Sequence, residues 1–63
     1  DDVNLLSKDI ETYEELGMRD NSLILAEKIL KKGYPVSKLK NSPDLKNLIK
    51  DRRFKLLIEK YSK

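Results

Sequence analysis

Three glutamates, Glu11, Glu14 and Glu15, are spaced so that a helix would gather their carboxylates within little more than one turn. Grouped carboxylates can transfer protons or hold a divalent cation, but catalysis also requires burial or a charged neighbour that shifts a pKa. Nothing in the surrounding sequence predicts such burial. A solvated helix face is therefore the favoured interpretation, ahead of a partner-binding face and of a metal or catalytic site.

The sequence contains no His, Cys or Trp. Their absence excludes imidazole acid/base catalysis, thiol nucleophiles, disulfides and nearly all zinc sites. We therefore predict that the protein is not an enzyme and binds no cofactor and no metal. A chain without Cys fits any compartment, so the localisation stays open, with the cytoplasm favoured.

Charge is divided unevenly along the chain. Residues 1–30 carry eight acids and three bases, a net −5, whereas residues 31–63 carry three acids and eleven bases, a net +8. Nucleic-acid binding needs cations on one face and often aromatic side chains that are free to stack, yet Phe54 and Tyr61 fall on a predicted buried stripe. A solvated face is favoured, contact with an acidic protein surface comes next, and nucleic-acid binding is unlikely but remains the alternative. The basic candidates are Lys38, Lys40, Lys46, Lys50, Arg52, Arg53, Lys55 and Lys60.

The elements that position these residues are predicted to be helices. Val3, Leu6, Ile10 and Tyr13 recur at steps of three and four, which predicts an amphipathic helix over residues 2–16 that ends at Gly17. Asp1 or Asp2 would cap its start. A second helix is predicted to follow a short turn, with Asp20 or Asn21 as its N-cap, and to run to Lys32 before Gly33.

The second half predicts shorter helices. Pro35 prevents continuation of the second helix, and a single helical turn is expected to begin at Leu39. Ser42 and Pro43 predict the start of a short helix over residues 43–50, with the Ser42 hydroxyl as its cap. Asp51 then caps a last helix, which buries the i, i+3, i+4, i+7 stripe formed by Phe54, Leu57, Ile58 and Tyr61.

The 63 residues allow one small domain. A chain this short buries only about 60% of the surface that its unfolded form exposes, so we expect it to use a neighbour's surface as well. No apolar run approaches the length of a membrane span, and we predict no membrane contact. Because the chain begins with Asp1 rather than Met, we expect a trimmed product or a piece of a longer protein.

Two segments resemble the tetratricopeptide repeat family. Tyr13-Glu-Glu-Leu-Gly17, the small residues Ser22 and Ala26, and Lys-Lys-Gly-Tyr ending at Tyr34 are similar to one helical hairpin of that family. The tail LKNSPDLKNLIKDRRFKLL, residues 39–57, resembles the segment that closes bacterial arrays, in which DPDL and DPRF turns flank a short helix. The resemblance implies an all-α fold with a hairpin over residues 1–34 and capping helices over residues 35–63, in one domain.

The resemblance also implies a function. Such hairpins bind proteins or peptides through a groove lined by the first helix, and a single hairpin is fewer than the three or so repeats that an array needs. The chain would therefore cap the preceding repeats of a longer chain, or it would self-associate. The groove positions implied by the family pattern are Asn4, Ser7, Glu11, Glu14 and Glu15.

A further surface is predicted from the residues themselves. Leu56 lies off the buried stripe of the last helix, and with Ile24 and Leu25 it could form an exposed apolar patch for a neighbouring repeat or a second copy. A protein-interaction or capping module is the favoured function. A small basic nucleic-acid-binding domain is the second hypothesis, and an inhibitory protein steered by its charge is the third.

Overall fold

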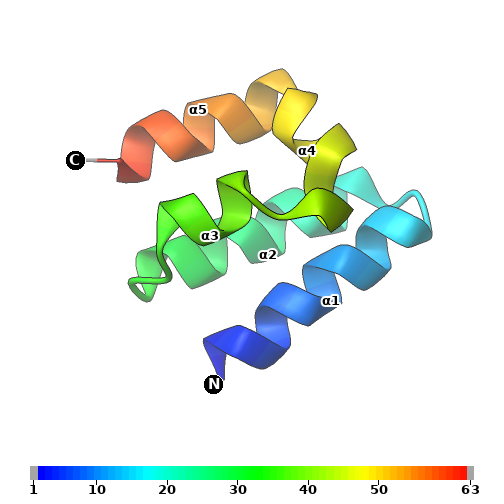
Figure 1. The fold of residues 1–63 in the computed structure, drawn as a ribbon, viewed down its shortest axis with the longest axis horizontal. Helices are drawn as coiled ribbons and strands as arrows, with labels where there is room; N and C mark the ends of the chain where they lie inside the picture. Colours follow the sequence, from blue (N-terminus) through cyan, green and yellow to red (C-terminus); the bar gives the residue numbers. More distant parts are fainter. Residues whose placement is uncertain (1, 63) are drawn as a thin grey trace.

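The computed structural model describes residues 2–62, and within that range every regular element is a helix (Figure 1). This confirms the predicted all-α fold, a helical hairpin followed by short helices and a final helix. No helix in this range combines the length and the apolar character of a bilayer span. The elements are α1 (Val3–Glu15), α2 (Arg19–Lys31), α3 (Val36–Lys40), the 3₁₀ helix η1 (Pro43–Leu45), α4 (Lys46–Lys50) and α5 (Arg52–Tyr61).

The hairpin of α1 and α2 has defined ends. The Asp2 carboxylate caps α1 by accepting a 2.9 Å hydrogen bond from the backbone N–H of Asn4, whereas Asp1 lies outside the described residues. Gly17 has φ +75°, the left-handed conformation that ends a helix at little cost only in glycine. The N–H of Met18 then donates to the carbonyl of Tyr13 at 2.8 Å, as the predicted helix end requires.

The start of α2 differs from the prediction. Neither Asp20 nor Asn21 is the N-cap, because the helix begins at Arg19 and its cap residue Met18 makes no side-chain hydrogen bond. The carbonyl of Met18 accepts from both the N–H and the hydroxyl of Ser22, at 3.1 and 3.2 Å. Helical hydrogen bonding therefore starts directly after the Gly17 turn, which places Asp20 inside the first turn.

The short helices supply leucines to the core. The predicted helix over residues 43–50 is divided into η1 and α4, and Ser42 contributes its carbonyl to the N–H of Leu45 rather than a hydroxyl cap. The predicted cap Asp51 is confirmed, since its carboxylate accepts from the N–H of Arg53 at 2.8 Å. The predicted stripe of α5 is confirmed as well: Phe54 is buried and its three companions are half-buried.

The helices form two layers around one core. α1, α2 and α5 lie side by side, and α3, η1 and α4 cover one side of α2 (Figure 1). The opposite side of α2 faces outward, and α2 and α5 run in the same direction. The core consists of Ile10, Leu23, Ala26, Ile29, Leu30, Leu39, Leu45, Leu48 and Phe54.

Candidate functional site

Two ion pairs join α2 to α5. Nη1 of Arg53 lies 2.9 Å from Oδ1 of Asp20, and Nζ of Lys60 lies 3.2 Å from Oε2 of Glu27. Both pairs join residues 33 apart in sequence, so each connects one turn of α2 to the facing turn of the parallel helix α5. The hydroxyl of Tyr61 also donates to Oε2 of Glu27, at 3.2 Å.

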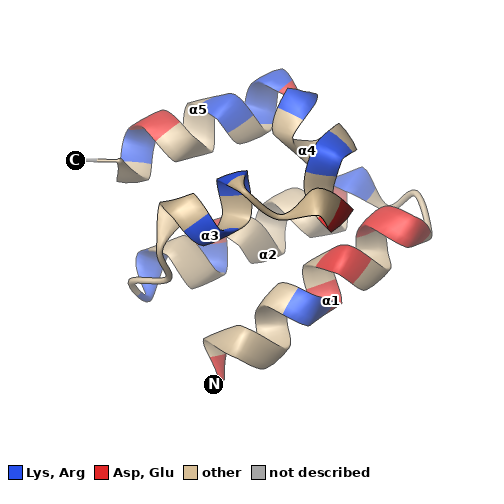
Figure 2. Ribbon diagram, in the orientation of Figure 1, with Lys and Arg blue, Asp and Glu red and all other residues tan. Residues whose placement is uncertain are grey.

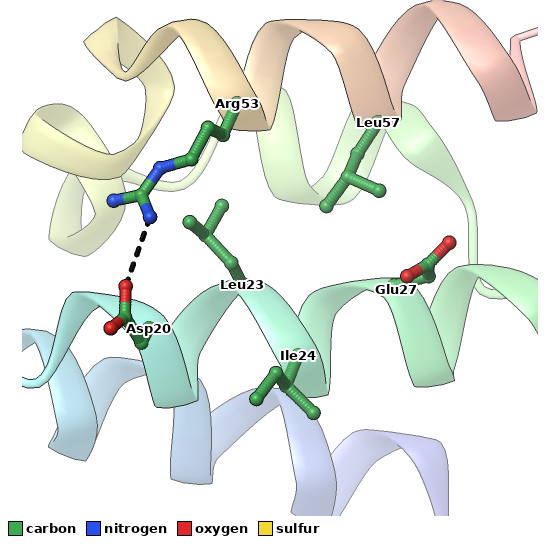
Figure 3. Close-up of a pocket in the computed structure, with 6 residues that line it drawn as sticks. All are labelled: Asp20, Leu23, Ile24, Glu27, Arg53 and Leu57. Carbon is green, nitrogen blue, oxygen red and sulfur yellow. Dashed lines mark hydrogen bonds and ion pairs between the residues drawn. The ribbon is translucent and has the colours of Figure 1, made fainter.

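An open hollow of about 540 Å³ lies between the two helices, and we call it the α2–α5 groove. Figure 3 shows Leu23 of α2 and Leu57 of α5 pointing toward each other across it, with Ile24 directed outward. The Arg53–Asp20 pair closes one end. The groove residues are Asp20, Leu23, Ile24, Glu27, Arg53 and Leu57.

Ile24 lines this groove and is 70% exposed, whereas Leu56 is 59% exposed and lies on α5 outside the set of residues that line the groove. Ile24 lies on the same helical stripe as Asp20 and Glu27, which contact α5. Leu56 lies at i+3 from Arg53 and i−4 from Lys60, the two residues that contact α2. Ile24 therefore lies at the groove between the two ion pairs, while Leu56 lies beside it, about 100° around α5 from the groove residue Leu57.

Leu25 does not belong to this surface, contrary to the sequence prediction. It is half-buried and packs against the core. One residue along an α-helix rotates the side chain by about 100°, which separates Leu25 from Ile24. The predicted patch is thus reduced to Ile24 and Leu56.

The charged groups that border the groove are held in their ionised forms. The hydrogen bond from Lys60 lowers the pKa of Glu27 below its ordinary value, and the same contact raises the pKa of Lys60. Hydrogen bonds to Asp51 and Asp20 raise the pKa of Arg53. These groups stay ionised around neutral pH, so the groove offers fixed charges beside an apolar floor rather than a proton donor or acceptor.

The residues assigned to the first helix by the family resemblance occupy different environments. Asn4 and Glu15 are exposed, while Ser7 and Glu11 are half-buried, and the Ser7 hydroxyl donates to the carbonyl of Asn4 at 2.7 Å. The Glu14 side chain is only 8% exposed, so the expected solvated face is wrong at this position. Only part of the implied row is therefore available to a partner.

Glu14 is buried because Arg19 binds it from the start of α2. Nε and Nη2 of Arg19 donate to the two carboxylate oxygens of Glu14 at 2.8 and 2.9 Å, and Nη1 donates to Asp51 at 2.9 Å. Hydrogen bonds from Arg53 and Arg19 lower the pKa of Asp51 to about 2, and the Glu14 contact raises that of Arg19. This clasp links α1, α2 and the cap of α5. Sequence reasoning missed it, although an arginine directly after the Gly17 turn was the available signal.

Metal coordination finds no support in the part of the chain that the structure describes, where no three acids are grouped to hold an ion. The fold and the groove define a small all-α domain with an amphipathic outer groove. No protein-family model matches the sequence, and comparisons with curated proteins and with solved structures find no match either.

Proposed function

We propose that this chain is a non-catalytic protein-interaction module, similar to the capping end of a tetratricopeptide array, and that it contacts its partner through the α2–α5 groove. The observation that carries the proposal is the position of Ile24, a largely exposed apolar residue of the groove between two ion pairs, with the exposed Leu56 beside it on α5. An apolar centre inside a charged rim is the usual anatomy of a protein interface.

Energetics support the same reading. Burying an exposed leucine or isoleucine side chain contributes about 1.5–3 kcal/mol, which is substantial beside the nine buried hydrophobic residues found in the described range 2–62. The occupant expected from the resemblance is a preceding repeat, and a second copy of the chain is the other candidate. Catalysis is disfavoured because Glu27, the groove carboxylate hydrogen-bonded to Lys60, has a lowered pKa, which is the wrong direction for proton transfer near neutral pH.

Nucleic-acid binding is the weaker candidate because the contacts of its residues do not favour it. Phe54 is buried, and the half-buried ring of Tyr61 already has Nζ of Lys60 5.5 Å from its centroid, so neither ring is an open platform for a base. Arg53 and Lys60 are both engaged by acids of α2. Two of the eight basic candidates are thus partly neutralised.

The experiment fuses the chain to the carboxyl end of a consensus tetratricopeptide array that lacks its own terminal helix. Repeats that stack unfold together. Capping should therefore raise the thermal midpoint of the array, and the array and the fused chain should unfold in one transition rather than two. Ile24→Ser and Leu56→Ser should abolish the gain. Leu5→Ser is the matched control, because Leu5 is an equally exposed leucine on α1, at 60%, and should change nothing.

Two results would contradict the proposal. One is a fusion whose parts unfold at the same temperatures as they do separately, combined with sedimentation of the isolated chain as a monomer at every concentration. The other is a gain in midpoint that Leu5→Ser abolishes as completely as Leu56→Ser, because the contact would then lie on α1 and not at the groove.

A further inference from the structure

A second hollow, of about 260 Å³, lies on a different side of α5 from the α2–α5 groove. Phe54 and Ile58 each follow a groove residue by one position, and the resulting rotation of about 100° turns them toward α3 and α4. Ile49 of α4 completes an apolar floor. We call this site the lysine-rimmed hollow, and it is lined by Lys40, Ile49, Phe54, Lys55 and Ile58.

The two lysines at its rim differ from the cations of the α2–α5 groove. Lys40 and Lys55 are exposed and form no ion pair with any residue of the described range 2–62. Arg53 and Lys60, by contrast, are paired with Asp20 and Glu27. The hollow therefore combines an apolar floor with two cations that are available to an external anion.

The surface around the lysine-rimmed hollow is positively charged, like its two lysines. Figure 2 shows Lys and Arg along α3, α4 and α5, whereas Asp and Glu gather on α1. Residues 31–63 carry a net charge of +8. A surface of one sign attracts a partner of the opposite sign and raises its association rate.

The size of the hollow decides what kind of group it accepts. A cavity of about 150 Å³ holds one benzene ring, while pockets for small-molecule ligands begin near 300 Å³. At about 260 Å³ the hollow suits one large apolar side chain of a longer ligand. A nucleic-acid base is a poorer fit, because Phe54 is only 1% exposed and offers no ring face for stacking.

We propose that the lysine-rimmed hollow binds an acidic peptide segment of a partner protein, which inserts one aromatic or large aliphatic side chain onto the half-buried Ile49 and Ile58, above the buried Phe54. Carboxylates that flank this anchor pair with Lys40 and Lys55. The site does not depend on the α2–α5 groove, so it stands or fails separately from the function proposed above.

The test measures fluorescence anisotropy of a labelled glutamate-rich peptide with a single central phenylalanine, at low salt. A matched peptide carries serine in place of the phenylalanine, and we expect it to bind about tenfold more weakly. Lys40→Glu and Lys55→Glu should each weaken binding of the phenylalanine peptide about fivefold. Lys8→Glu is the control, since it changes the net charge equally on α1, and it should weaken binding less than about twofold.

Three results overturn the proposal, provided that circular dichroism shows each variant to be folded. The serine peptide binds as tightly as the phenylalanine peptide, which means that charge alone attracts it. Lys8→Glu weakens binding as much as Lys55→Glu, which means that no local site exists. A single-stranded oligonucleotide displaces the peptide at a lower concentration than unlabelled peptide does, which means that the basic surface serves nucleic acid.

Discussion

The α2–α5 groove and the lysine-rimmed hollow both depend on Phe54. It is 1% exposed, it belongs to the core, and it lines the lysine-rimmed hollow. It also anchors α5, the helix that carries Arg53, Leu56 and Lys60. Replacing Phe54 by alanine should therefore destabilise the whole domain rather than fray one end of it.

The expected size of the effect follows from the burial. A buried phenylalanine replaced by alanine typically loses about 3–5 kcal/mol of unfolding free energy, through lost apolar burial and the cavity left behind. A 63-residue domain has about 3–9 kcal/mol in total. Phe54→Ala should consequently leave the domain marginal or unfolded at 25 °C, whereas Phe54→Leu should lose about 1–2 kcal/mol and stay measurable.

Urea unfolding followed by far-UV circular dichroism measures both variants. With a slope of about 1 kcal/mol per molar urea for a chain of this size, Phe54→Leu should lower the midpoint by about 1–2 M. Leu56→Ala is the control on the same helix, because a residue that is 59% exposed should change the midpoint by less than about 0.5 M. The reasoning is refuted if Phe54→Leu and Leu56→Ala share one midpoint, since α5 would then not be docked by its aromatic ring.

Two further predictions concern the helix ends. Because the Arg53 and Arg19 hydrogen bonds lower the pKa of Asp51 from 3.8 to about 2, its ionised form stabilises the fold above about pH 4, and this stabilisation is lost as the pH falls from 4 to 2. The thermal midpoint of the wild type should fall more steeply over that interval than the midpoint of Asp51→Asn, and parallel curves would contradict the prediction. Gly17→Ala should lower the free energy of unfolding by about 1–2 kcal/mol, measured by chemical denaturation, and Gly17→Asn should lower it less. The cause is the backbone, since φ is +75° and a Cβ at this position would meet nothing within 4 Å. Equal stability of the wild type and both variants would exclude backbone strain.

The helices could be predicted from the sequence wherever a local signal is complete. Gly17 and Gly33 both have positive φ and end α1 and α2, and the carboxylate of Asp51 caps α5. The start of α2 could not be predicted in the same way. Two good capping residues were present at Asp20 and Asn21, but the hydrogen bonds of the turn after Gly17 allow the helix to begin earlier.

The candidate groove was predictable only in part, because its residues come from two helices that are distant in sequence. Periodicity placed Leu56 outside the buried stripe of α5, and the structure finds it exposed. Periodicity within α2 could not separate Ile24 from Leu25, because that helix carries apolar residues on several sides and only the positions of α1 and α5 decide which are covered. Arg19, which covers Glu14, follows it by only five residues, so a local signal for that pair was present. The bond from Arg19 to Asp51 joins residues 32 apart, and no local pattern encodes it.

The two ion pairs of the groove have a different role from the packing beneath them. Arg53 and Asp20 are both exposed, and pairs in such surroundings contribute little to stability because water screens them. The register of α2 and α5 must therefore rest mainly on Leu23, Leu57 and the buried ring of Phe54. What the ion pairs add is a pair of opposite charges on each side of Ile24. If the proposed partner buries Ile24 and Leu56, its charges would have to match these ion pairs or stay unpaired; on that proposal the ion pairs would select the partner and the apolar residues would supply the affinity.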